Sequence, residues 1–241
     1  MWIKKQETGF IQSTKGREMG KLIVIEGTDS SGKETQTKKI YERLLNEGKN
    51  VRKISFPNYD SPACEPVKMY LAGKFGDNAS KVNPYPVSAM YAIDRYASYK
   101  MDWGKFLEKD GIIITDRYTT SNMVHQASKI ENSDEKKSYL NWLEDLEYNK
   151  MELPQPDMVI FLNMPTDMAV KLMAERKNKI TGKEEKDIHE KNRDYMKKSY
   201  ENACEIARIY NWQEIKCVDG KLKSIDEIGE EIYNLVTSIL D

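Results

Sequence analysis

Short apolar runs alternate with longer amphipathic segments along the chain from about residue 20 onward. The runs are rich in β-branched side chains, and Gly or Pro ends most of them, so each run predicts a buried strand. The predicted strands are 21–27, 51–57, 111–118 and 157–165, with a weaker fifth at 215–220.

The longer segments repeat their apolar positions with a helical period. In 34–49, the side chains of Ile40 and Leu44 share one helical face, and Gly48 is a typical C-terminal stop. Short all-apolar strands that alternate with amphipathic helices predict an α/β fold with a parallel sheet covered on both faces. Further helices are predicted at 138–150, 167–177, 187–211 and 225–240.

The sequence shows no internal repeat and no long low-complexity linker, so we expect a single domain over 19–241. Residues 1–18 are polar and irregular, which predicts a disordered or upstream N-terminal extension. The most polar stretch, 177–187, lies between two predicted helices. It predicts either a solvated loop or a mobile lid, which would span about 176–190.

Composition narrows the classes of partner. The chain has 241 residues with 38 Lys and Arg against 39 Asp and Glu, so its charge favours neither nucleic acid nor membrane. No apolar run is long enough to span a bilayer, and the N-terminus lacks the apolar stretch of a secretory signal. Cys64, Cys204 and Cys217 are widely spaced, as reduced thiols would be. We therefore expect a cytoplasmic protein that binds small molecules.

The segment GTDSSGKETQ (27–36) matches most of the phosphate-loop pattern G-x-x-x-x-G-K-[ST]. It follows a predicted strand and opens a predicted helix, where backbone N–H groups and the helix dipole attract an anion. Lys33 adds a full charge for the terminal phosphates of a nucleotide. The predicted phosphate-binding residues are Gly27, Ser30, Ser31, Gly32, Lys33, Glu34 and Thr35.

One position of this loop departs from the pattern. Glu34 stands where a hydroxyl usually helps to hold magnesium, and the hydroxyl follows one place later, at Thr35. Magnesium keeps several waters and needs few protein ligands, so we still expect phosphate binding. Whether Thr35 takes over as a ligand is left open.

Two further charged positions fall where ligands bind in α/β folds. Asp116 and Arg117 come at the end of a predicted strand, at the crevice of the sheet. They are either functional groups or a structural ion pair.

Tyr91 and Arg95 are four residues apart on one helical face, so that an aromatic plane lies beside a guanidinium. This pair suits a nucleobase; ordinary packing with a surface ion pair to Asp94 is the alternative.

Taken together and in this order, the motifs resemble those of the thymidylate kinase family over most of 20–240. The loop alone is shared by many families, whereas D-R-Y-x-x-S together with F-P and the spaced Arg is much more specific. The matching pieces are IEGTDSSGK, SFPNY, the helix from Tyr91 to Arg95, TDRYTTS, FLNMPTDMAVKLMAER and VDGKLKSIDEI.

The resemblance implies a P-loop kinase fold with a five-stranded parallel sheet, helices on both faces and a short lid. It implies transfer of the γ-phosphate of ATP to dTMP with Mg²⁺, in dTTP biosynthesis, by a homodimer. Lys33 would contact the donor phosphates, and Arg117 would clamp the acceptor phosphate. Asp29 would lie near the sugar and the transferring phosphate, and Asp116 near the metal.

For the acceptor, the resemblance implies that Tyr91 stacks on thymine and that Arg95 donates to a base oxygen. His125 stands where many relatives have tyrosine near the sugar, which suggests altered sugar discrimination. The implied dTMP-binding residues are Asp29, Phe56, Pro57, Tyr59, Tyr91, Arg95, Arg117, Ser121, Asn122 and His125.

A second departure concerns the catalytic cation. Some family members carry an arginine inside the loop, where this chain has Ser30 and Ser31. The cation is therefore expected from the lid, where Arg176 matches best in position. The expected catalytic residues are Lys33, Arg117, Asp29 and Arg176.

Two other functions remain compatible with these residues. A deoxynucleoside kinase would accept thymidine and would need no clamp for an acceptor phosphate. A nucleotide-binding regulatory protein would bind ATP without turnover, and Glu34 and the missing loop arginine keep this alternative open.

Overall fold

The computed structural model describes residues 20–173, 189 and 193–240. The predicted N-terminal extension, 1–18, and almost all of the predicted lid lie outside the described residues. Arg176 is among these, so its predicted role stays a prediction.

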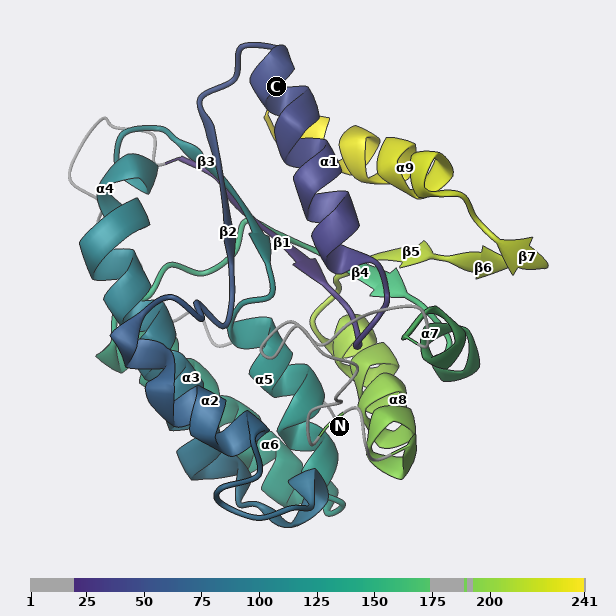
Figure 1. The fold of residues 1–241 in the computed structure, drawn as a ribbon. Helices are drawn as coiled ribbons and strands as arrows, with labels where there is room; N and C mark the ends of the chain where they lie inside the picture. The colour runs from purple at the N-terminus through teal and green to yellow at the C-terminus, as the bar shows by residue number, and fades with distance from the viewer. Residues whose placement is uncertain (1–19, 174–188, 190–192, 241) are drawn as a thin grey trace.

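Five parallel strands form one sheet, which confirms the predicted five-stranded parallel sheet, and their order is β2-β3-β1-β4-β5 (Figure 1). Strand β1 lies in the middle, so the loop that follows it emerges at the centre of the carboxyl edge of the sheet. This is the edge at which parallel sheets bind ligands. The strands are β1 (Leu22–Glu26), β2 (Val51–Ser55), β3 (Ile112–Asp116), β4 (Met158–Asn163) and β5 (Gln213–Lys216).

The central strand is buried on both faces. Ile23 and Ile25 pack into one hydrophobic cluster, while Leu22 and Val24 pack into another. This division follows from the alternation of side chains along a strand, and it explains why the run is apolar at successive positions.

One face of the sheet is covered by α1 (Lys33–Asn46) and α9 (Ile225–Thr237), which lie side by side (Figure 1). Ile40 of α1 and Ile232 of α9 belong to the cluster that includes Ile23 and Ile25. A capping box between Ser224 and Glu227 starts α9 just beyond the sheet. The short helix α7 (Thr166–Met173) adds Ala169 to the same cluster.

The opposite face carries α3 (Pro84–Ser98), α5 (Thr119–His125) and α8 (Arg193–Ile209) (Figure 1). Val124 of α5 and Ala203 of α8 pack against Phe161 of β4. The other elements are α2 (Glu65–Leu71), α4 (Gly104–Leu107), α6 (Ser133–Glu144), the π-helices η3 (Tyr99–Trp103) and η5 (Asp145–Lys150), and the 3-10 turns η1 (Pro62–Cys64), η2 (Ala79–Lys81) and η4 (Ala127–Lys129).

The weak fifth strand was predicted in the wrong place. The sheet strand β5 ends at Lys216, and β6 (Val218–Asp219) instead pairs antiparallel with β7 (Lys221–Leu222) in a separate ribbon. Gly220 makes the tight turn between them with a φ of 66°.

Helix boundaries also differ from the pattern. Helix α6 starts at Ser133 rather than 138, because the Asn132 side chain accepts from the backbone N–H groups of Asp134 and Glu135 at 2.9 and 3.0 Å. The described part of the predicted helix 187–211 begins at Arg193. Helices α2 and α5 span only seven residues each, too short for a periodic signal to reveal them.

No helix in the described part of the chain has the length and apolar character that crossing a bilayer requires. Cys64, Cys204 and Cys217 form no disulfide. Burial raises the pKa of the Cys64 and Cys217 thiols to about 12, so both are protonated and unreactive at neutral pH.

Candidate active site

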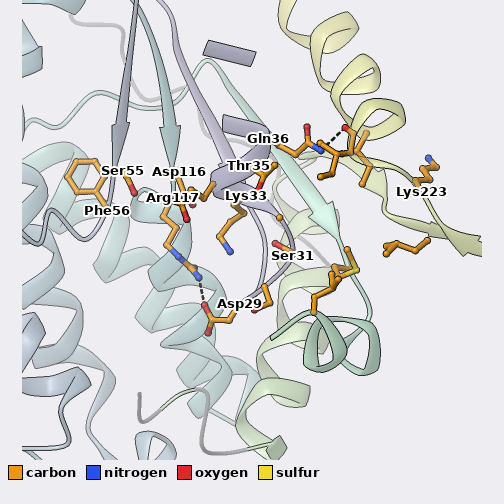
Figure 2. Close-up of a pocket in the computed structure, with 18 of the residues that line it drawn as sticks. Asp29, Ser31, Lys33, Thr35, Gln36, Ser55, Phe56, Asp116, Arg117 and Lys223 are labelled. Atoms are coloured by element: carbon orange, nitrogen blue, oxygen red, sulfur yellow. Dashed lines mark hydrogen bonds and ion pairs between the residues drawn. The ribbon is translucent and has the colours of Figure 1, made fainter. Parts of the chain in front are cut away.

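Two adjoining cavities open at the carboxyl edge of the sheet. The larger, of about 350 Å³, is lined by the 29–36 segment, the ends of β2 and β3, and the start of α9 (Figure 2). The smaller, of about 70 Å³, is lined mainly by α3, α5 and the segment after β2. Both cavities share Asp29, Phe56, Pro57, Tyr59 and Arg117.

The phosphate loop has the geometry that its glycines require. Gly32 has a φ of 89°, and α1 begins at the next residue. A Cβ atom at Gly27 would lie 2.5 Å from the Ser31 hydroxyl oxygen, so a side chain there would push into the loop. The first turn of α1 lines the larger cavity and supplies an electropositive helix end to it.

Lys33 carries the charge of this loop. Its side chain points into the larger cavity (Figure 2), and its amine donates to the carbonyl of Thr28 at 2.7 Å. Burial and the nearby Arg117 lower the pKa of Lys33 to about 8, and neighbouring carboxylates oppose that shift. Lys33 is therefore mostly charged at neutral pH, as phosphate binding needs.

The backbone of Arg117 is held in an uncommon conformation. Its φ is 68°, a left-handed value that costs a non-glycine residue about 1 kcal/mol or more. The Arg117 N–H donates to the Ile25 carbonyl at 3.2 Å, and the Thr115 hydroxyl donates to the Arg117 carbonyl at 2.7 Å. These contacts fix the turn after β3, so the side chain points toward the loop after β1 (Figure 2).

The Arg117 guanidinium stands where the two cavities meet. One nitrogen, Nη2, pairs with the Asp29 carboxylate, and Nη1 donates to Ser121 Oγ at 3.3 Å and His125 Nε2 at 2.9 Å. Burial disfavours its charge, but the carboxylates of Asp29 and Glu26 outweigh burial and raise the pKa of Arg117. A permanent, forked cation therefore faces both cavities.

Glu26 is a buried charged residue beside the site that the sequence analysis did not single out. It is fully buried, and it accepts from the Gly27 N–H at 2.9 Å and from the hydroxyls of Thr120 and Ser121 at 2.6 and 2.8 Å. It also lies 3.8 Å from Arg117 Nη1. Glu26 thus ties the phosphate loop to α5. The sequence signal that could have identified Glu26 is a single carboxylate at the end of an otherwise apolar strand.

All of the residues expected to bind dTMP line the smaller cavity, although no ligand contact tests their individual roles. Arg95 is buried, with Nε and Nη2 bonded to the two oxygens of Glu147 at 2.6 and 2.5 Å. The alternative of a surface ion pair to Asp94 is therefore wrong. Asp94 is itself buried and accepts from the Asn58 N–H at 2.8 Å, which anchors the turn after Pro57 to α3.

One cluster of side chains has the composition of a metal site. Asp29, His125 and His189 place possible ligand atoms within 4.8 Å of one another. Arg117, however, bonds both the Asp29 carboxylate and His125 Nε2. Because a guanidinium already holds two of the three groups, this cluster is an ion-pair network rather than a cation site.

A magnesium site finds better support at Asp116. The Asp116 side chain is buried at the end of β3, and its Oδ1 has no hydrogen-bond partner among the described residues. It lines the larger cavity together with Thr35 (Figure 2). An orphaned carboxylate oxygen beside a phosphate loop fits a hydrated magnesium ion.

The buried histidines predict how stability depends on pH. Burial lowers the pKa of His189 to about 4 and that of His125 well below its ordinary value. The unfolded chain therefore binds more protons below about pH 6.5, and stability falls as pH drops from there toward 4. Between pH 7 and 4.5 we expect His189 to account for a loss of about 2–3 kcal/mol, and His125 to add to that loss.

Denaturant unfolding at several pH values measures this loss. In His189→Phe, His125 is the remaining histidine, so the loss over the same interval should be about 2–3 kcal/mol smaller than in the wild type. An unfolding free energy that stays constant between pH 6.5 and 5 would contradict burial of neutral imidazoles.

A central phosphate loop on a parallel sheet, with two cavities that meet at a guanidinium, defines the class of P-loop nucleotide kinases. The family model for thymidylate kinase matches residues 25–232. The chain belongs to the thymidylate kinase family.

Individual relatives agree with this assignment. The chain is 32% identical to a probable thymidylate kinase of Sulfolobus acidocaldarius over 220 residues, which cover 91% of this chain and 98% of that protein. It is 31% identical to the thymidylate kinase of Mycobacterium tuberculosis over 149 residues, covering 61% of this chain and 68% of that protein. The structure of a thymidylate kinase from Candida albicans matches with a TM-score of 0.67 at 22% identity, covering 91% and 92% of the two chains. At this identity the last match supports the fold.

Proposed function

We propose that this protein transfers the γ-phosphate of ATP to dTMP, which gives dTDP and ADP, in the cytoplasmic supply of dTTP. The observation that carries the proposal is that two cavities share Asp29 and Arg117. One ligand bound at the phosphate loop and another bound beside α3 and α5 would therefore meet at a single cation, as group transfer requires.

The larger cavity suits the phosphates of ATP. Lys33 and the first turn of α1 supply positive charge, and the buried hydroxyls of Ser30 and Ser31 have no partner among the described residues. Asp116, with Thr35 beside it, would hold Mg²⁺, which when bound neutralises charge on the donor phosphates. Arg176 remains the predicted source of a further cation.

The smaller cavity suits a nucleoside monophosphate. Tyr91 supplies an aromatic face. Glu147 holds the Nε and Nη2 edge of Arg95, and Nη1 makes only a long contact of 3.5 Å with the Tyr118 carbonyl, so Nη1 is the Arg95 nitrogen best placed to donate to a ligand. Arg117 would clamp the acceptor phosphate, and Asp29 would orient it. Because a phosphate oxygen is already largely ionised at neutral pH, this attack needs no strong base, and positioning supplies most of the catalysis.

Purified protein with ATP and Mg²⁺ tests the proposal against a panel of dTMP, dUMP, dCMP, AMP, UMP and thymidine. We expect dTMP to be converted with the highest kcat/KM. Faster turnover of thymidine would identify a deoxynucleoside kinase, and tight ATP binding without any product would identify a non-catalytic regulator.

We further propose that the protein is a homodimer through the outer surface of α2 and α3. Most of the large apolar side chains that the described residues expose gather in this part of the chain. They are Met69, Phe75, Tyr85, Ile93, Tyr96 and Met101. A second copy that packs against α2 and α3 would bury several of these side chains, and the burial of apolar area favours association.

A charged substitution tests this surface. Ile93 on α3 and Leu45 on α1 are both 49% exposed, so Leu45→Glu is a matched control for Ile93→Glu. We expect Ile93→Glu to halve the mass measured by light scattering, while Leu45→Glu leaves the dimer intact. A wild-type protein that is monomeric at micromolar concentration would contradict the proposal.

A further inference from the structure

The two histidines of the chain, far apart in sequence, meet in the smaller cavity. His125 ends α5, and His189 lies ahead of α8. Their ring centroids are 5.6 Å apart, the planes differ by 16°, and each side chain is only 6% exposed. No role was assigned to His189 by the sequence patterns, so the pair is a product of the fold.

A hydrogen bond determines which nitrogen of His125 carries the proton. Arg117 Nη1 lies 2.9 Å from His125 Nε2. A guanidinium can only donate, so Nε2 is the acceptor, and in the neutral ring the proton resides on Nδ1. His125 can therefore hold Arg117 only while its imidazole is neutral.

A second chain of hydrogen bonds reaches His189. The Lys129 amine lies 3.2 Å from the Tyr70 hydroxyl and 3.1 Å from the Val82 carbonyl, and burial lowers the pKa of Lys129 to about 7. The Tyr70 hydroxyl in turn lies 2.9 Å from His189 Nε2. Burial lowers the pKa of His189 to about 4, so this ring is also neutral at pH 7.

The surroundings of the pair support two neutral rings. Arg117 stands on the His125 side, Lys129 stands behind Tyr70, and Asp29 is the carboxylate that faces the pair. Burial favours the neutral form of both rings. Protonation of His125 would remove its acceptor and place a second cation against the guanidinium.

Tyr195 is a second aromatic neighbour of His125 among the described residues. The Tyr195 ring lies 6.4 Å from it and 4.8 Å from the His189 ring, and the Tyr195 hydroxyl donates to the His125 backbone carbonyl at 3.0 Å. The stacked His189 ring is the closer aromatic neighbour of His125 and fixes the direction of Nε2.

We propose that His189 is a positioning residue for the acceptor: its ring supports that of His125, which holds the Arg117 guanidinium opposite Asp29. The inference rests on the proposed function, because the clamping role of Arg117 belongs to that proposal. Loss of the stack lets the guanidinium turn toward Glu26 and Ser121, which already lie within 3.8 and 3.3 Å. Loss of the stack should therefore weaken binding of the acceptor and leave binding of ATP unchanged.

The first test uses the unaltered protein. Because the sequence holds two histidines, full-length protein labelled with ¹⁵N-histidine and free of a histidine tag shows two imidazole spin systems. We expect both rings to be neutral at pH 7, with the His125 proton on Nδ1. A charged ring, or a proton on Nε2 of His125, would overturn the inference without any variant.

The second test uses kinetics with a matched pair of variants. We expect His189→Ala to raise the KM for dTMP about tenfold, with kcat and the KM for ATP changed less than about threefold. His189→Phe keeps a ring against His125 and should recover most of the affinity. An unchanged KM for dTMP in folded His189→Ala, or an equal rise for ATP, would overturn the inference.

The two proposals fail in different ways. Wild-type protein that makes no dTDP rejects the proposed function, whereas the labelled histidines report on the neutral stack regardless of turnover. Unfolding curves show whether His189→Ala folds. If it does not, the histidine spectra of the wild-type protein test the inference.

Discussion

Arg117→Ala is expected to lower kcat/KM for dTMP by about 10²- to 10³-fold. Among the described residues, Arg117 is the only cation that lines both cavities, so the variant removes the positive charge at the point where they meet. It also leaves Asp29 and Glu26 without their shared counter-ion. Two carboxylates would then repel the acceptor phosphate. Arg117→Lys keeps the charge but not the fork, and it should recover only part of the loss.

Steady-state kinetics with varied dTMP at saturating ATP measure this effect. Arg43→Ala is the control, since Arg43 lies on α1 and pairs with Glu47 and Glu230 away from the cavities. Turnover of dTMP within tenfold of wild type in Arg117→Ala would show that another group clamps the acceptor. A deoxynucleoside kinase would retain thymidine turnover in the same variant.

Glu147→Ala is expected to lower the free energy of unfolding by about 3–5 kcal/mol, because it leaves the Arg95 guanidinium buried without a counter-ion. Arg95 is 1% exposed and Glu147 is not exposed at all. Burial disfavours the charge of Arg95, but Glu147 outweighs burial and raises the pKa of Arg95. Because a guanidinium has an ordinary pKa far above neutral, Arg95 stays charged without Glu147 as well, and the variant cannot relieve the penalty by losing a proton. Thr119 also donates to Glu147, at 2.7 Å, and would lose that acceptor.

Denaturant unfolding at pH 7.5 checks this value. Glu135→Ala on α6, which removes an exposed carboxylate, should change the unfolding free energy by less than about 0.5 kcal/mol. Combining Arg95→Met with Glu147→Leu should destabilise less than Glu147→Ala alone, since no charge is left unpaired. A loss below about 1 kcal/mol in Glu147→Ala would show that water reaches the guanidinium.

The strands and the phosphate loop were predictable because their signals are local. An apolar run such as 22–26 is buried on both faces whatever covers it, and the glycines at 27 and 32 are required by the loop itself. The fifth strand was predicted at 215–220, whereas β5 spans Gln213–Lys216. The prediction ran on into the β6–β7 ribbon, because an apolar residue followed by a glycine turn is also the pattern that ends a sheet strand.

The charged residues show the opposite case. The pattern around Tyr91 and Arg95 indicated a ligand-binding face, and both residues do line the smaller cavity. The alternative partner considered for Arg95, its sequence neighbour Asp94, was wrong, because the ion pair forms with Glu147, which lies in a π-helix far along the chain. Nothing in the local pattern distinguishes Glu147 from an exposed carboxylate.

The sequence by itself determined the α/β class, the phosphate loop and the kinds of side chain that line the two cavities. These features depend on periodicity and on backbone requirements within a few residues. Only the tertiary structure decided that Glu26 ties the loop to α5, that Glu147 neutralises Arg95 and that His189 supports His125. A buried polar group must find its partner wherever the chain topology brings one, and that pairing is not encoded in local sequence.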